Sequence, residues 1–323
     1  MLSLDTIYEP IREDLVKVED GLRSVYQGSP SWLSELLAHS LGSSGKRVRP
    51  ALVLLSGRFC SYNLSRLLPM ALAVEVLHTA TLIHDDAIDN STVRRGRATI
   101  NKVWGEDKAI LLGDYLLAKA EELAAATENL PVVRLFARTI MAIASGELRQ
   151  SFDAFRLEQT RQQYIERISG KTASLLYLAT ESGAILSQAP QELVTALREY
   201  GHNLGIAFQI VDDILDFIGD EVEMGKPVGS DLAEGTLTLP AMLLLERYPD
   251  DNPVRRLFQN EGDRQENIRQ AIELFRDSPL VEECYQVASD YHARGCRNLE
   301  VLPDNASRRS LQELAGYVLA RKK

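Results

Sequence analysis

The sequence contains few of the residues that mark disulfide-rich or zinc-binding proteins. Only three cysteines occur, Cys60, Cys284 and Cys296, and no two of them form a C-x-x-C pair. A disulfide framework or a zinc ribbon is therefore not expected. Scattered thiols in an odd number are typical of a reducing compartment, so we expect a cytoplasmic protein.

The sequence also lacks an excess of positive charge. It has 36 Lys and Arg against 46 Asp and Glu over 323 residues, a formal net charge of −10, which argues against broad nucleic-acid binding. No stretch approaches the ~18 uninterrupted apolar residues of a membrane span. The first residues include Asp5, Glu9 and Arg12 in place of an apolar core, so we expect no secretory signal.

Prolines are also few, 12 in all, and most of them stand between long runs with helical spacing. In these runs apolar residues recur three and four positions apart, and no series of alternating strands competes with them. The sequence therefore predicts an all-α, single-domain helical bundle over residues 1–323. The runs are Ala51–Leu55, Leu68–Ile83, Ala109–Ala126, Val132–Phe155, Tyr164–Leu186 and Leu193–Phe217.

One aspartate pattern, D-D-x-x-D, occurs twice, each time at the end of an apolar helical run. On a helix the first and third aspartates face the same way. Carboxylates crowded near a helix C-terminus repel one another, and the negative end of the helix dipole disfavours their charge. This arrangement is unfavourable unless a cation is present. Ligands with oxygen alone suit Mg²⁺ or Mn²⁺, and the spacing of an EF-hand is missing. The two motifs are Asp85, Asp86 and Asp89, and Asp212, Asp213 and Asp216.

Four clusters of basic residues accompany these motifs. Each alone could be a solvated surface, but together with two metal sites they predict diphosphate binding, because Arg and Lys clamp phosphates. A P-loop is excluded because Ile165 stands where that motif needs its first glycine before Gly170. The clusters are Lys46, Arg47 and Arg49; Arg94, Arg95 and Arg97; Lys171 beside Thr172; and Lys226.

Helical phase suggests that polar side chains converge on a cavity. His78, Asp85 and Asp89 fall on one stripe, since they are seven and four residues apart. A second stripe is small and polar, opposite an apolar one, which indicates a helix that lines a cavity. Its members are Gly205, Gln209, Asp212 and Asp216.

These residues make the chain recognisable: it resembles the trans-isoprenyl diphosphate synthases, the polyprenyl synthetase family, over nearly its whole length, and long-chain synthases most. The stretches that carry the resemblance are GKRVRP, EVLHTATLIHDDAIDNSTVRRGRATIN, LLGD, SGEL, GKTASL, FQIVDDILDF and GKPVGSDLAEGTLTLP.

The resemblance implies an isoprenoid synthase fold around a deep central cavity, usually in a homodimer. It also implies a Mg²⁺-dependent enzyme, with three ions in each active site, that joins isopentenyl diphosphate to an allylic diphosphate such as farnesyl or geranylgeranyl diphosphate. The product would be an all-trans polyprenyl diphosphate, and contact with a membrane surface could serve its release.

Carried over to this sequence, the resemblance implies a role for each site residue. Asp85, Asp89 and Asp212 would ligate the metal, supported by Asp86, Asp213 and Asp216. Arg94, Lys171 and Lys226 would hold the allylic diphosphate, and Lys46, Arg49, His78 and Arg95 would hold isopentenyl diphosphate. Thr172 and Gln209 would place oxygen dipoles near the developing allylic cation. One departure is Thr236, which stands where members usually carry Lys.

Product length should depend on how deep the cavity runs below the first motif. Ala80 and Thr81 are small at the two positions where bulky aromatics stop short products in the family. A tail can therefore pass them, and Leu77 lies only about 12 Å from Asp85 along a helix axis. We expect a product of C30 or longer, with geranylgeranyl diphosphate as the alternative. The residues expected to line or end the tail's path are Leu77, Ala80, Thr81, Phe136, Ile140 and Ile143.

Two other interpretations stay open at this point. A class I terpene cyclase also ionises an allylic diphosphate, but it would normally carry a different second motif and no isopentenyl diphosphate site. A non-catalytic subunit of a two-component synthase would be expected to lose aspartates or basic residues that this chain retains.

Overall fold

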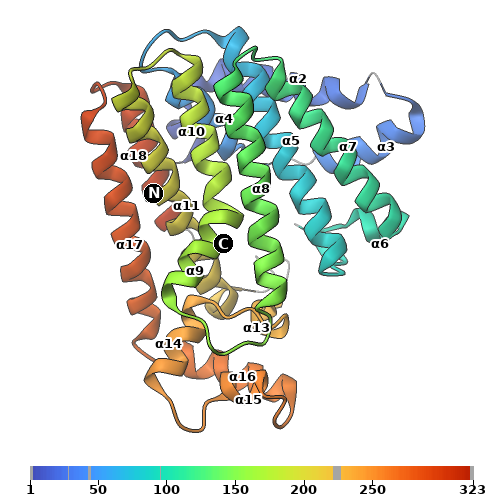
Figure 1. Cartoon of the computed structure of the whole chain (residues 1–323), viewed down its shortest axis with the longest axis vertical. Helices are drawn as coiled ribbons and strands as arrows, with labels where there is room; N and C mark the ends of the chain where they lie inside the picture. Colours follow the sequence, from blue (N-terminus) through green and yellow to red (C-terminus); the bar gives the residue numbers. More distant parts are fainter. Residues whose placement is uncertain (1–2, 28, 43–44, 95, 221–226, 321–323) are drawn as a thin grey trace. The chain divides into compact units, whose positions relative to one another are not determined.

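The computed structural model describes residues 3–27, 29–42, 45–94, 96–220 and 227–320. Within them the chain is helical apart from loops and one hairpin, so the predicted all-α class is confirmed (Figure 1). The hairpin pairs β1 (Val93–Arg94) with β2 (Arg97–Ala98) in antiparallel fashion. It forms the turn directly after the first aspartate motif.

The chain folds into two compact units. The first comprises Met1–Ile140, Leu175–Gly201 and Cys296–Leu314, and the second comprises Met141–Ser174, His202–Gly295 and Ala315–Lys323. The single domain predicted from the sequence therefore stays a prediction. The helices whose residues belong to both units are α8 (Leu130–Phe152), α10 (Ser174–Leu186), α11 (Gln191–Ile218), α17 (Leu280–Asn298) and α18 (Ala306–Leu319).

The first unit is built around α5, the helix that ends in the first aspartate motif. Asn63 caps the start of α5 by accepting a hydrogen bond from the Ser65 amide. The neighbouring α4 is buried from Pro50 to Gly57, and α7 lies along α5 (Figure 1). Besides β1 and β2, the elements that lie wholly in this unit are α1 (Leu4–Ile7), η1 (Glu9–Ile11), α2 (Arg12–Gln27), α3 (Ser31–Leu41), α4 (Val48–Gly57), α5 (Leu64–Ile88), α6 (Ile100–Trp104), α7 (Glu106–Ala125) and η3 (Leu299–Val301).

Helix α5 is long and apolar enough to cross a membrane by length and composition alone. Most of its apolar stretch is buried inside the fold. A buried core helix passes the same test, and burial explains the apolar character of α5 here.

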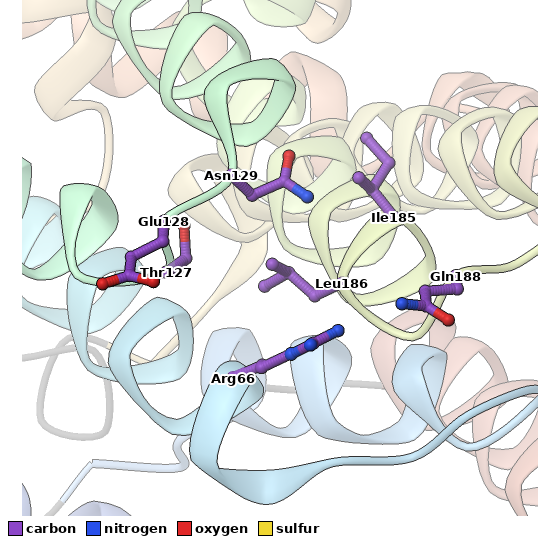
Figure 2. Close-up of a pocket in the computed structure, with 7 residues that line it drawn as sticks. All are labelled: Arg66, Thr127, Glu128, Asn129, Ile185, Leu186 and Gln188. Atoms are coloured by element: carbon purple, nitrogen blue, oxygen red, sulfur yellow. The ribbon is translucent and has the colours of Figure 1, made fainter.

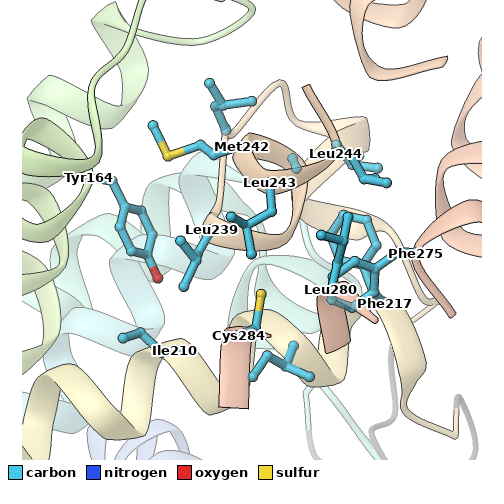
Figure 3. Packing of buried hydrophobic residues seen from close by; sticks show 14 of the residues in the cluster. Tyr164, Ile210, Phe217, Leu239, Met242, Leu243, Leu244, Phe275, Leu280 and Cys284 are labelled. Atoms are coloured by element: carbon cyan, nitrogen blue, oxygen red, sulfur yellow. The ribbon is translucent and has the colours of Figure 1, made fainter. Parts of the chain in front are cut away.

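The second unit carries the other aspartate motif on α11 and has its own apolar core. Figure 3 shows Tyr164, Ile210, Leu239 and Cys284 gathered in this core, where the rings of Phe217 and Phe275 lie 5.0 Å apart. The elements that lie wholly in this unit are α9 (Arg161–Ile168), η2 (Ser169–Ala173), α13 (Ser230–Ala233), α14 (Leu239–Arg247), α15 (Pro253–Phe258) and α16 (Arg264–Arg276).

The run predicted over Tyr164–Leu186 is interrupted in the structure. Helix α9 starts at a capping box between Thr160 and Gln163. A π-helical turn, η2, then carries Gly170, Lys171 and Thr172 before α10 begins. Such turns are rare, and many occur at functional sites.

Candidate active site

The first aspartate motif forms the C-terminal end of α5. Asp85 is half-buried, Asp89 is exposed, and Asp86 is only 6% exposed. The Arg94 guanidinium of β1 donates to Asp86 Oδ1 at 2.7 Å. Burial raises the pKa of Asp86 and the Arg94 charge partly offsets this rise. Arg94, which we expected to hold a diphosphate, therefore also anchors the buried aspartate of this motif.

Other groups fix the chain around this motif. Asn101 of α6 donates its amide to the backbone oxygens of Asp86 and Ser91. His84 contacts the backbone oxygen of Ile110 and lies 3.3 Å from Asp114. Gly113 of the LLGD stretch leaves room for the His84 ring, since a Cβ there would come to 2.2 Å from His84 Nε2. The sequence had not indicated Asn101 as a positioning residue, although the RGRATIN stretch contains it.

The three cations of GKRVRP, the stretch that leads into α4, have different environments. Arg47 donates to Glu75 at 2.8 Å and to both carboxylate oxygens of Glu19, with its backbone in the left-handed region at φ 48°. The Tyr8 hydroxyl donates to the Lys46 backbone oxygen. Arg47 therefore anchors the loop, whereas Lys46 is exposed and Arg49 is half-buried. Of the other expected diphosphate ligands, His78 is half-buried in α5, and Arg95 lies outside the described residues.

The second motif lies in the last two turns of α11 and is more deeply buried. Asp212 is half-buried, whereas Asp213 and Asp216 are 2% and 0% exposed. Asp216 accepts the Ser230 hydroxyl at 2.7 Å and the Asp231 amide at 3.1 Å. Asp216 therefore anchors the start of α13.

Asp213 is held from both sides by uncharged donors. The Tyr164 hydroxyl donates to Oδ2 and the Gln209 amide donates to Oδ1, each at 2.7 Å. Burial and the nearby Asp231 charge raise the pKa of Asp213 to about 7. The amide oxygen of Gln209 in turn accepts the Thr172 hydroxyl at 2.6 Å. Thr172 and Gln209, for which the same role was predicted, are thus hydrogen-bonded to each other. Tyr164, which the sequence did not indicate, is connected to them through Asp213.

The π-helical turn packs tightly against two helices. Gly205 of α11 allows the close approach of Ala173, since a Cβ there would come to 2.4 Å from the Ala173 Cα. Gly205 therefore serves this close packing. A Cβ at Gly146 would likewise come to 3.0 Å from the Lys171 amide nitrogen. Lys171 forms an ion pair with Glu147 at 2.6 Å, so any diphosphate must compete with this carboxylate.

The other expected residues lie as follows. Lys226 is outside the described residues, and Thr236 is buried in the loop before α14. Leu77, Ala80 and Phe136 are fully buried, Ile143 is buried, and Ile140 is half-buried. Thr81 donates its hydroxyl to the His78 backbone oxygen, so that hydroxyl is satisfied within the helix.

One cavity in the first unit, of about 230 Å³, has none of the expected site residues in its lining (Figure 2). Its lining is mostly charged or polar, which does not suit an isoprenoid tail. Arg66, which lines it, is about 28 Å from Asp85 along the axis of α5. The lining residues are Arg66, Thr127, Glu128, Asn129, Ile185, Leu186 and Gln188.

Comparison with known proteins identifies the family. The polyprenyl synthetase family model matches residues 30–275. The chain belongs to the polyprenyl synthetase family. It is therefore a polyprenyl diphosphate synthase, a prenyltransferase.

Relatives match the chain from end to end. Heptaprenyl diphosphate synthase component 2 of Geobacillus stearothermophilus is 37% identical, over 98% of each chain. A crystal structure of heptaprenyl diphosphate synthase from Staphylococcus aureus has a TM-score of 0.92 at 37% identity, covering 97% of this chain and 99% of that one. Polyprenyl synthase of Caulobacter crescentus, complexed with calcium and isoprenyl diphosphate, has a TM-score of 0.93 at 33% identity, covering 99% and 98%.

The family is metal-dependent, and the donors in this chain fit a hard divalent cation. Asp85 of α5 and Asp89, the C-cap residue of that helix, offer carboxylate oxygens, and so does Asp212 of α11. Among the residues that the structure describes, no group of three acidic, His or Cys side chains is close enough to hold a metal alone. Mg²⁺ does not require such a cage, because it retains waters and takes oxygens from substrate phosphates.

Proposed function

We propose that this enzyme joins isopentenyl diphosphate to an allylic diphosphate, farnesyl or geranylgeranyl diphosphate, and extends it to an all-trans polyprenyl diphosphate of C30 or longer. The observation that carries the proposal is the exposure pattern of the two aspartate motifs. Asp85, Asp89 and Asp212 remain accessible, whereas Asp86, Asp213 and Asp216 are buried and hydrogen-bonded. This pattern supports a division into metal ligands and anchors.

Asp85, Asp89 and Asp212 would hold the metal, which we propose is Mg²⁺, with three ions for each active site and Mn²⁺ as a substitute. When bound, the metal would withdraw charge from the leaving diphosphate. Arg94, Lys171 and Lys226 would bind the allylic diphosphate, and Lys46, Arg49, His78 and Arg95 would bind isopentenyl diphosphate. Thr172 and Gln209 would stabilise the allylic cation through their oxygen dipoles.

The proposed chain length rests on the residues one turn before the first motif. Ala80 is small and fully buried, and Leu77 and Phe136 are buried as well. A growing tail would pass Ala80 and Thr81 and end deeper, near Leu77, Phe136 and Ile140. Relatives named for long products, such as heptaprenyl and solanesyl diphosphate synthases, share 37% and 36% identity with this chain. Geranylgeranyl diphosphate is the alternative product.

The deciding experiment uses the single purified chain. It is incubated with Mg²⁺, farnesyl diphosphate and labelled isopentenyl diphosphate, and the dephosphorylated products are separated by chromatography. We expect labelled products of C30 or longer. A C20 product would support the geranylgeranyl alternative. An unlabelled terpene hydrocarbon would indicate a cyclase, and no product would contradict activity of the chain alone.

We also propose that the chain forms a homodimer through one face of α8. Met141, Leu148 and Phe152 are 61–72% exposed, and their spacing of seven and four places them on one stripe. Large apolar side chains in a row on a surface are typical of an interface. Light scattering should give twice the chain mass, and Leu148→Glu should lower it. A monomer that becomes active only with a second protein would support the two-component alternative, since one relative is named component 2 of such an enzyme.

A further inference from the structure

A chain of three hydrogen bonds in the second unit leads from the apolar core to the π-helical turn. Tyr164 of α9 donates to Asp213, Gln209 donates to the other oxygen of Asp213, and Thr172 donates to Gln209, at 2.7, 2.7 and 2.6 Å. The inner pair, Tyr164 and Asp213, is 1% and 2% exposed, whereas Gln209 and Thr172 are half-exposed. Figure 3 shows Tyr164 in the core beside Leu239.

The direction of these hydrogen bonds is fixed from the inner end. In its ionised form Asp213 can only accept hydrogen bonds: its Oδ2 accepts the Tyr164 hydroxyl and its Oδ1 accepts the Gln209 amide. Gln209 must therefore turn its NH₂ group inward, and its carbonyl oxygen faces Thr172. The Thr172 hydroxyl then donates inward, and its lone pairs point away from Gln209. The carbonyl oxygen of Gln209 and the hydroxyl oxygen of Thr172 are thus each held in one orientation.

The backbone at the outer end is also held in place. The π-helical turn that carries Thr172 packs against Gly146 and Gly205, where a Cβ would come to 3.0 and 2.4 Å from it. Inside the core, Arg167 donates to the Leu237 backbone oxygen and lies over the Tyr164 ring at 5.6 Å. Packing therefore restricts the motion of both the Tyr164 ring and the turn that carries Thr172. A preorganised set of dipoles requires this restriction.

We propose that Tyr164 is a positioning residue for the chemical step: it holds Asp213 so that Gln209 and Thr172 keep their oxygens oriented toward the developing allylic cation. The inference rests on the proposed roles of Thr172 and Gln209. An oriented dipole stabilises charge that appears only in the transition state, so its loss should reduce kcat more than it raises KM.

The test compares two tyrosines that are equally buried. Tyr164→Phe removes the hydroxyl that binds Asp213. Tyr200→Phe is the matched control, because Tyr200 is also fully buried and donates one hydrogen bond of 2.7 Å, to the Leu311 backbone oxygen. We expect Tyr164→Phe to lower kcat by about 10- to 100-fold, with KM for both substrates changed by less than about threefold. Tyr200→Phe should lower the thermal stability about as much as Tyr164→Phe does, but it should leave kcat nearly unchanged.

Two further readouts separate positioning from general damage. The rise in melting temperature on adding Mg²⁺ and inorganic diphosphate should be the same in Tyr164→Phe as in the wild type. The double variant Tyr164→Phe/Thr172→Val should be no slower than Thr172→Val alone, since both changes interrupt one chain. If Tyr164→Phe does not fold, Asp213→Asn is used, because an amide there can present N–H to Gln209 and should lower kcat in the same way.

Three results would overturn the inference: a wild-type kcat in Tyr164→Phe, equal losses in the two tyrosine variants, or additive losses in the double variant. If Thr172→Val and Gln209→Leu lower kcat but Tyr164→Phe does not, only the role of Tyr164 is wrong. If Thr172→Val and Gln209→Leu also keep the wild-type kcat in an enzyme that makes polyprenyl product, the proposed roles of Thr172 and Gln209 are wrong.

Discussion

The two aspartate motifs share one spacing but not one environment. In both motifs the first aspartate is half-buried and the second is buried. Each motif therefore has one accessible carboxylate and one that is anchored by hydrogen bonds. The anchors differ: Asp86 is paired with the cation Arg94, whereas Asp213 is held by the uncharged Tyr164 and Gln209.

The third aspartates differ most. Asp89 caps the end of α5 and is exposed, whereas Asp216 is completely buried and organises the start of α13. Identical spacing therefore predicts which aspartates can share a side of the helix, but not whether the neighbouring chain covers them. The comparison indicates that Asp89 can be replaced with little effect on folding, and that Asp216 cannot.

The largest expected effect is on turnover, and it tests whether the first aspartates of the two motifs, Asp85 and Asp212, are equivalent. Asp85→Ala or Asp212→Ala should each lower turnover by about 100- to 1,000-fold, because each removes a proposed metal ligand that stabilises the leaving charge. Circular dichroism should show an intact helical fold in both. Near-normal turnover of both variants at saturating Mg²⁺ would contradict the metal-binding role.

The next effect separates the cations of the two units. Lys46→Ala and Arg49→Ala should raise KM mainly for isopentenyl diphosphate, and Lys171→Ala mainly for the allylic substrate. Each lost charged contact should cost about 1.5–3 kcal/mol in kcat/KM. Lys119→Ala, which also removes a lysine from an ion pair, with Glu122, is the control and should change neither KM. If all three variants weakened the same substrate, the division of the cations would be wrong.

A smaller effect concerns stability and contrasts the third aspartates. Asp216→Ala leaves the Ser230 hydroxyl and the Asp231 amide without their acceptor, which should lower the free energy of unfolding by about 1–3 kcal/mol. Asp89→Ala removes an exposed side chain and should change it by less than about 0.5 kcal/mol. Urea denaturation without metal measures both. Equal losses would mean that the burial of Asp216 does not stabilise the second unit.

The same contrast indicates how far the sequence could lead. The helical class, the existence of α5 and α11 and the candidate residues follow from apolar spacing, the repeated motif and the family resemblance, although α5 extends four and five residues beyond the predicted run Leu68–Ile83. The exposure of each aspartate does not, because it depends on residues far along the chain. Tyr164 lies 49 positions from Asp213, and no local pattern connects them.

Arg47 is a second example. The sequence placed Arg47 in one basic cluster with Lys46 and Arg49, and the structure shows that Glu19 and Glu75 bind it. Both carboxylates are distant in sequence, so only packing could reveal the pairing. The π-helical turn at Ser169–Ala173 was hidden for a similar reason, since its apolar spacing resembles that of an ordinary helix.

The last prediction concerns product length and uses corresponding positions of the two motifs. Ala80 lies five residues before Asp85, Ala207 lies five residues before Asp212, and both are 1% exposed. Overpacking either position should cost about 1–3 kcal/mol of stability, so the stability effects are matched. Ala80→Phe should shorten the main product by several isoprene units, toward C15 or C20, because the added ring blocks the path of the tail. Ala207→Phe should leave the product distribution unchanged.

Chromatography of the dephosphorylated products distinguishes the two variants, and Ala207→Val replaces Ala207→Phe if the latter does not fold. The comparison is informative because a general loss of activity would lower the amount of product in both variants without changing its length. An unchanged distribution from a folded, active Ala80→Phe enzyme would mean that the tail does not pass Ala80. Shorter products from both variants would mean that product length responds to packing changes in general. The position before the first motif would then not determine product length.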